Sequence, residues 1–111
     1  MLTRDQIFSA NDFKTKDIPV EAWGGTVRIR GLSAKDRDEF ESSLALTQDM
    51  RNLRARLVVK SIVDDQGVRV FSDEDAEALG DKDGEVMDML FDEVRNLSGM
   101  SDEALGIAEG N

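Results

Sequence analysis

A chain of 111 residues, 40% of them hydrophobic, is sized for one globular domain and is too apolar to be disordered. The lack of cysteine and histidine excludes disulfides, thiolate metal sites and histidine-based catalysis. A net charge of −10 argues against nucleic-acid binding, because the phosphates would be repelled.

The first predicted elements are a short helix and an edge strand. Thr3 and Gln6 fit a capping box, which starts a helix whose apolar face is Ile7 and Phe8. Residues 13–22 look extended and alternate apolar with polar side chains, as in a half-buried strand. Pro19 has no N–H for a ladder hydrogen bond, so we expect this strand at the edge of its sheet.

Gly24 and Gly25 predict a tight turn that returns the chain as a second strand over residues 26–30. This strand alternates inward aliphatic side chains with outward arginines. Trp23 lies at the turn. It either folds over the end of the small sheet or stays exposed as a binding residue.

Two helices are predicted next. Ser33 is a good N-cap for a helix over residues 34–48 that carries Phe40 and Leu44 on one face. After a break at residues 47–50, we predict a central helix over residues 51–63. Its apolar stripe is Leu53, Leu57 and Ile62, widened by Val58 and Val59, and Arg54, Arg56 and Lys60 face away.

The following segment combines turn, strand and helix signals. Residues 64–67 (DDQG) have turn chemistry, and residues 68–71 alternate like a short strand. Ser72 caps a short helix that ends at Gly80, and Asp83 caps a helix over residues 84–97. The apolar stripe of that helix is Val86, Met87, Leu90, Phe91, Val94 and Leu97.

These elements predict an α+β fold, with small antiparallel hairpins packed against four to five helices around a single core. We expect one globular domain over residues 1–98. Residues 99–111 are thin in apolar side chains, which predicts a flexible or loosely docked tail.

No catalytic, cofactor or metal site is predicted. No pair of carboxylates stands apart from the many solvated ones. Residues 81–85 (DKDGE) resemble part of a calcium loop, but with Gly84 at loop position six the first and twelfth positions are Leu79 and Leu90, where carboxylates are needed. We therefore expect a protein without enzymatic activity.

The acidic residues are concentrated in one third of the chain. Residues 64–93 sum to −10, whereas residues 1–63 sum to +2. Such a surface favours basic protein partners or simply keeps the protein soluble. The cluster of Arg51, Arg54, Arg56 and Lys60 either pairs within the chain or meets the acidic third of a neighbouring copy, giving head-to-tail self-association.

Three segments together resemble the tail assembly chaperones of long-tailed (siphovirus-type) bacteriophages. The first is MLTRDQI, residues 1–7. The second is EAWGGTVRIRGLS, residues 21–33, which runs into RDEFE at residues 37–41. The third is NLRARL, residues 52–57, followed by DDQGVRVFSDEDAEALG at residues 64–80. The likeness covers roughly residues 1–98.

The resemblance implies a specific role. Such chaperones bind the long, helical tape measure protein, keep it soluble and extended, and help to recruit tail tube subunits around it, and they are absent from the mature virion. Many are also made as a longer, frameshifted form whose extra domain contacts the tail tube protein, so this chain would be the short form. With no membrane span and no signal peptide in the sequence, the expected location is the host cell cytoplasm.

Binding a helical client needs an apolar patch with a polar rim. The candidate protein-binding residues are Trp23, Phe71, Met87, Met89 and Phe91. Two alternatives remain open: a structural minor tail or head–tail junction protein that persists in the virion, and an acidic mimic of DNA that occupies a host nuclease or regulator.

Overall fold

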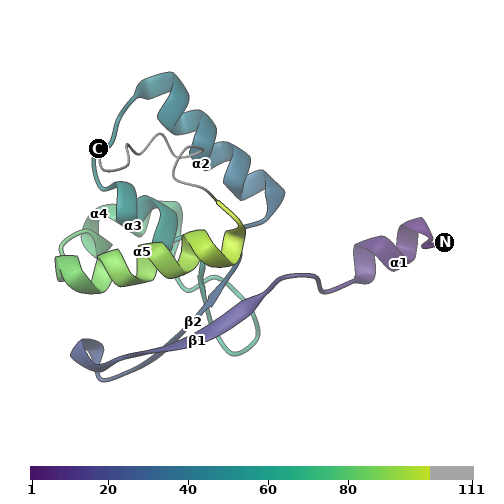
Figure 1. Ribbon diagram of the computed structural model, residues 1–111, viewed down its shortest axis with the longest axis horizontal. Coiled ribbons are helices and arrows are strands. Elements are labelled where there is room, and N and C mark those ends of the chain that lie inside the picture. Colours follow the sequence, from purple (N-terminus) through teal and green to yellow (C-terminus); the bar gives the residue numbers. More distant parts are fainter. Residues whose placement is uncertain (101–111) are drawn as a thin grey trace.

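The computed structural model describes residues 1–100 of the chain, and its fold is α+β as predicted (Figure 1). The helical elements are α1 (Arg4–Ser9), η1 (Glu21–Trp23), α2 (Ala34–Thr47), α3 (Leu53–Val58), η2 (Asp73–Asp75), α4 (Ala76–Leu79) and α5 (Gly84–Ser98). The strands are β1 (Thr15–Val20), β2 (Gly25–Arg30) and β3 (Ile62–Val63).

The three strands form one antiparallel sheet in the order β1-β2-β3. β1 lies at the edge, as the proline predicted, and Ile18 pairs with Val27 across the hairpin. β1 is shorter than the predicted strand because the chain turns through η1 into Gly24, whose φ of 74° is left-handed. β3 pairs only with Arg28 and Ile29, so most of the outer edge of β2 is left without a partner strand among the described residues.

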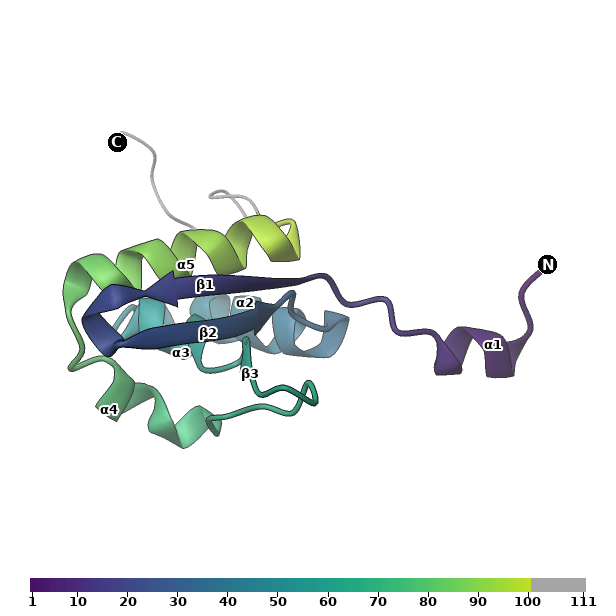
Figure 2. The same cartoon turned by 90° about the horizontal axis from the view of Figure 1, so that it is seen from below.

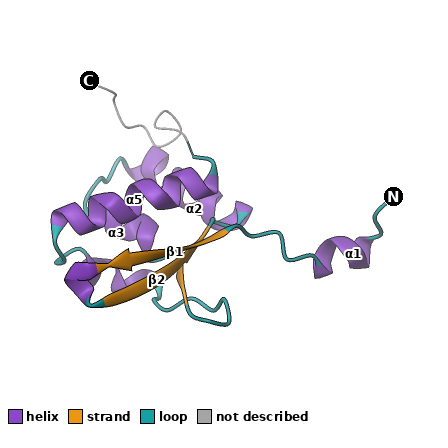
Figure 3. Cartoon of the chain, turned by 60° about the horizontal axis from the view of Figure 1, so that its bottom comes forward, coloured by secondary structure: helices purple, strands orange, loops and turns teal. Residues whose placement is uncertain are grey.

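The helices cover the sheet and enclose the core. α5 runs alongside the β1–β2 hairpin, with α2 and α3 behind it (Figures 2 and 3). The largest side chains that are completely buried include Ile29 from β2, Leu57 from α3 and Leu90 from α5. The predicted stripe of α5 therefore faces the interior, and α5 contacts both α3 and β2.

Most of the predicted caps are present. Thr3 and Gln6 form the capping box of α1, and the Ser33 hydroxyl accepts a hydrogen bond from the Asp36 N–H at 3.0 Å. The Asp83 carboxylate accepts hydrogen bonds from the first turn of α5, which ends at Gly99 with a φ of 69°. The short helix after Ser72 begins as η2, continues as α4 and ends at Gly80.

The central helix is shorter than predicted. α3 ends at Val58, and Ile62 and Val63 belong to β3 instead of continuing the helix over residues 51–63. Ser61 explains the change, because its hydroxyl donates a 2.5 Å hydrogen bond to the Arg30 carbonyl, and the Arg30 N–H donates back to the Ser61 carbonyl at 3.0 Å. β-branched side chains at this point also favour a strand. Lys60, predicted to face away, is buried.

The predicted strand over residues 68–71 is also mostly absent. The turn before it is present, with Gly67 at a φ of 82°. After the turn, however, the segment makes only one bridge, between Val63 and Arg69. The Val70 N–H still donates to the Ile62 carbonyl at 3.0 Å, and the Arg69 guanidinium donates to the Val59 carbonyl at 3.1 Å and to the Asp73 carboxylate at 2.8 Å, which holds the segment beside β3 without a regular ladder.

The two ends of the described chain lie differently against the packed body. Residues 1–13 are exposed, and α1 stands away from the body (Figures 1 and 2). At the other end, Met100 is buried in the core. The rest of the expected tail, residues 101–111, lies outside the described residues.

Candidate functional site

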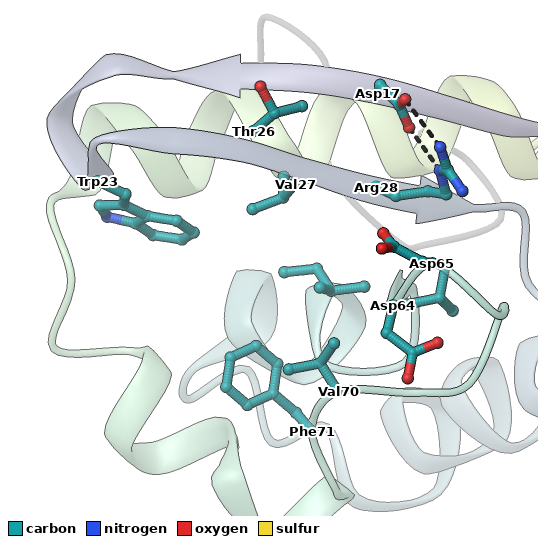
Figure 4. Close-up of a pocket in the computed structure, with 11 residues that line it drawn as sticks. Asp17, Trp23, Thr26, Val27, Arg28, Asp64, Asp65, Val70 and Phe71 are labelled. Atoms are coloured by element: carbon teal, nitrogen blue, oxygen red, sulfur yellow. Dashed lines mark hydrogen bonds and ion pairs between the residues drawn. The ribbon is translucent and has the colours of Figure 1, made fainter.

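An apolar groove lies where β3 ends and the edge of β2 opens. We call it the β2 groove (Figure 4). It is a hollow of about 450 Å³, within the size range of ligand pockets. Its lining comes from the hairpin, from β3 with the following turn, and from the segment after Arg69: Asp17, Trp23, Thr26, Val27, Arg28, Ile62, Val63, Asp64, Asp65, Val70 and Phe71.

One end of the groove is aromatic. Trp23 and Val27 project from the hairpin wall, and Phe71 and Val70 lie side by side on the opposite wall (Figure 4). Trp23, Val27 and Phe71 are half-buried, and Val70 is 52% exposed. Apolar side chains at these exposures are available to a partner, and covering them would remove apolar surface from water.

The other end is charged. The Arg28 guanidinium binds both oxygens of the Asp17 carboxylate, at 2.6 and 3.0 Å, across the strand pair. This hydrogen bonding lowers the pKa of Asp17, and it raises the pKa of Arg28, to which the nearby Asp65 also contributes. Because Asp17 already neutralises Arg28, the carboxylates of Asp64 and Asp65 leave this end of the groove acidic.

The outer wall, Val70 and Phe71, is held by hydrogen bonds and ion pairs. The Val70 N–H donates to the Ile62 carbonyl at 3.0 Å, and Arg69 fixes the segment to Asp73 and Val59. The buried Lys60 ammonium lies 3.3 Å from the Asp73 carboxylate. Hydrogen bonding from Arg69, together with the Lys60 charge, lowers the pKa of Asp73. The groove is therefore preformed by polar contacts behind its apolar wall.

The predicted binding residues differ in where they lie. Trp23 and Phe71 are brought together in the groove, and Trp23 also packs against the core. Met89 is half-buried on α5 outside the groove, whereas Met87 and Phe91 are buried in the core.

Sequence reasoning missed Val27 and Val70. Val27 had been assigned to the interior by strand alternation, and nothing local showed that β3 would end beside it. The sequence around Val70 could have predicted its exposure, because Val70 is an apolar residue next to Phe71 in a segment rich in turn-forming and acidic residues.

The basic cluster is paired within the chain. Arg51 binds Asp49, Arg54 binds Asp88, and Lys60 binds Asp73. The Arg56 guanidinium donates to the Asp49 carbonyl at 2.5 Å. These contacts favour the intramolecular alternative over a basic surface that would meet the acidic third of a second copy.

Two classes of site find no support in residues 1–100. No group of three or more acidic, histidine or cysteine side chains there is arranged to hold a metal ion. In the same part of the chain, no helix is long and apolar enough to cross a membrane. The β2 groove, which is lined by apolar and acidic side chains, is suited to binding a partner.

Comparison with known proteins agrees with this description. A family model described as phage tail assembly chaperone matches residues 3–106. Among solved structures, the chain is similar to the tail assembly chaperone of bacteriophage HK97, with a TM-score of 0.64 and 21% sequence identity, over 88% of this chain and 95% of that one. At that identity the likeness concerns the fold. A search of curated protein sequences gave no significant match.

Proposed function

We propose that this chain, which belongs to the family of phage tail assembly chaperones, binds the tape measure protein in the β2 groove and keeps it soluble during tail assembly. The family role is that of an assembly chaperone, which is not enzymatic. The proposal extends that role to a particular client and a particular surface. The observation that carries it is the preformed groove, in which half-buried apolar side chains stand open next to an acidic end.

The groove suits an amphipathic helix. The apolar face of such a helix would cover Trp23, Val27 and Phe71, which would bury surface that otherwise promotes aggregation. A lysine or arginine next to that face would meet Asp64 and Asp65. Because the whole chain carries −10, the loaded complex would remain highly charged and soluble.

The wider role we propose follows the family. The chaperone would act in the host cell cytoplasm, help to recruit tail tube subunits to the coated tape measure protein, and leave before the virion is complete. A frameshifted longer form would supply the contact with the tail tube protein. The alternative, a structural minor tail or head–tail junction protein, predicts that the chain stays in the particle.

Co-expression with the tape measure protein from the same genome tests client binding. We expect the two proteins to co-purify and the client to remain soluble. Val70→Asp should reduce the recovered client at least tenfold, because it places a carboxylate on the apolar wall of the groove. Val68→Asp is the matched control, since Val68 is 59% exposed on the same segment but does not line the groove.

Two results would count against the proposal. If the Val70 and Val68 variants recover equal amounts of the tape measure protein, the groove is not the site that binds it. If the unaltered chain recovers none, the tape measure protein is not its client. Mass spectrometry of purified virions distinguishes the chaperone role from the structural alternative. A stoichiometric amount of the chain in the particle would favour the structural protein.

A further inference from the structure

α2 is attached to the body through little apolar surface. Of its 14 residues, the buried ones are Phe40 and Leu44, whereas α5, with 15 residues, buries four. The last turn of α2 is exposed, and Leu46 there is 84% exposed. α2 also lies at the far side of the body from the β1–β2 hairpin (Figure 1). Segments that bury little apolar surface open locally, so α2 should open more readily than α5.

A polar cleft of about 290 Å³ lies between the middle of α2 and the body. Three of its lining residues belong to α2 and three to the body: Glu39, Phe40 and Ser43 on one side, and Arg56, Lys60 and Asp73 on the other. Polar contacts cross this cleft. The Arg56 guanidinium donates to the Ser43 hydroxyl at 2.9 Å, and the Lys60 ammonium lies 3.7 Å from the Glu39 carboxylate. Arg56 makes the stronger of these contacts, because 3.7 Å is too long for a hydrogen bond.

Arg56 also holds the break between α2 and α3. Besides its bond across the cleft, its guanidinium donates to the Asp49 carbonyl at 2.5 Å and to the Arg51 carbonyl at 3.2 Å. These carbonyls lie between Gln48 and Asn52, whose φ angles of 54° and 53° are left-handed. Residues other than glycine are strained in that region. One guanidinium thus fixes both the end of α2 and the strained segment that follows it.

The start of α2 is fixed independently of Arg56. The Leu32 N–H donates to the Ser98 hydroxyl at 3.0 Å, and the Arg37 guanidinium donates to the Ser98 carbonyl at 3.3 Å. Gly31 lies so close to α5 that a Cβ there would be 3.1 Å from the Leu97 carbonyl oxygen. A movement of α2 would therefore pivot about its start, and residues 48–52 would absorb the change in backbone angles.

We propose that α2 is a lid latched by Arg56, and that it swings away from the body while the rest of the domain stays folded. Opening uncovers Phe40 and Leu44 together with the part of the core that they cover. These side chains are spaced i and i+4, the spacing at which an amphipathic helix presents its apolar face. A partner helix with an apolar pair at this spacing fits the uncovered surface in place of α2. Its use by the client rests on the proposed function, whereas the opening itself does not.

The test uses the chain without a client and exploits its lack of cysteine. Leu44→Cys reports opening of the lid and Val94→Cys reports unfolding of the core, because these side chains are 8% and 0% exposed. The rate of reaction with a thiol reagent is measured at urea concentrations below the unfolding transition. The Leu44→Cys thiol should react about a hundredfold faster than the Val94→Cys thiol, and its rate should not change with urea.

Asp83→Ala separates local opening from unfolding of the whole domain. It removes the N-cap of α5, which stays formed when the lid opens and is lost when the core unfolds. Asp83→Ala should therefore raise the Val94→Cys rate about fivefold and leave the Leu44→Cys rate unchanged. Hydrogen exchange of the unaltered chain excludes an effect of the Leu44 substitution itself. The amides of residues 38–47 should exchange at a rate independent of urea, whereas exchange in residues 88–98 should increase with urea.

Arg56→Gln tests the latch. It should raise the Leu44→Cys rate about tenfold, because the hydrogen bonds from a charged group to α2 and to the break are lost. Arg54→Gln is the matched control on the same helix, since Arg54 pairs with Asp88 of α5 and has no contact with α2. That variant should change the Leu44→Cys rate less than about twofold.

The proposal is overturned if the two thiols react at the same rate, if Asp83→Ala accelerates both reactions equally, or if Arg56→Gln and Arg54→Gln have the same effect on the Leu44→Cys rate. None of these measurements involves the tape measure protein. A failure here therefore leaves client binding in the β2 groove untouched, and a failure of client binding leaves the lid untouched.

Discussion

Asp73 links the buried ammonium of Lys60 to the wall of the β2 groove. Replacing Asp73 should therefore lower the free energy of unfolding, by an amount that follows from these contacts. Its carboxylate accepts a 2.8 Å hydrogen bond from Arg69 and lies 3.3 Å from Lys60. Asp73→Asn removes the negative charge and leaves Glu39, at 3.7 Å, as the anionic partner of Lys60 among the described residues. Loss of a hydrogen bond to a charged group costs about 1.5–3 kcal/mol when both partners are buried.

The Asp73 side chain is 58% exposed, so solvent screening reduces this cost to about 1–1.5 kcal/mol. For a domain of this size, that corresponds to a fall in Tm of about 5–10 °C at pH 7. Thermal and urea denaturation followed by circular dichroism measure it. Asp88→Asn is the matched control, because Asp88 is 57% exposed but its partner Arg54 is also exposed, and we expect a change below about 0.5 kcal/mol.

The pH dependence has a definite sign. Because folding lowers the pKa of Asp73, its ionised form stabilises the protein above the ordinary value of 3.8, and this contribution is lost as the pH falls through the lowered pKa. The difference between Asp73→Asn and the unaltered chain should therefore shrink below about pH 4. In a Lys60→Met background the substitution should cost less by about 0.5–1 kcal/mol, since the buried cation is gone.

Equal destabilisation by Asp73→Asn and Asp88→Asn would refute this reasoning, because it would mean that burial of the cationic partner is irrelevant. A difference that persists unchanged at pH 2 would refute it as well. Asp73 is also the first residue of η2, where a negative charge is favoured by the helix dipole. That interaction could not explain a difference in stability that persists at pH 2, because it too requires the ionised carboxylate.

Three further predictions concern the caps and the break between α2 and α3. The pKa of Asp49 should be about 2, because the Arg51 side chain and backbone N–H both donate to its carboxylate, and an NMR titration should show it moving toward 3.8 in Arg51→Ala. Asp83→Ala should cost about 1 kcal/mol in urea denaturation, since two N–H groups of α5 lose their acceptor. Gly99→Ala should cost about 1 kcal/mol in the same assay through backbone strain alone, because a Cβ there meets no atom within 4 Å.

The sequence was most informative where structure is decided locally. The starts of α1, α2 and α5 follow from side chains at positions 3, 33 and 83 that satisfy N–H groups within the same few residues. The end of α3 depends instead on Ser61 meeting Arg30, which lies 31 residues earlier in the chain. No window around residues 51–63 contains that partner, so periodicity alone extended the helix too far.

The site was predictable only in part, for a related reason. Trp23 and Phe71 are large apolar residues next to turns, so their residue type alone marks them as candidates for exposure. Met87 and Phe91 belong to the same helical stripe as Leu90 and Val94, and that spacing already favoured the core over the surface. The isolation of α1 was not visible either, because a capping box specifies a helix and says nothing about what the helix packs against.

The groove arises where β3 stops. β3 pairs with β2 through Arg28 and Ile29, so residues 64–66 would have lain along the edge of β2 next to Val27 if β3 had continued. These residues form a turn instead, which leaves that edge of β2 open. The segment after the turn supplies Val70 and Phe71 opposite Val27, and Arg69 anchors this segment to Val59 and Asp73. The hydrogen bond that lowers the pKa of Asp73 thus also holds the apolar wall in place. A substitution that releases Arg69 should therefore change stability and binding in the groove together.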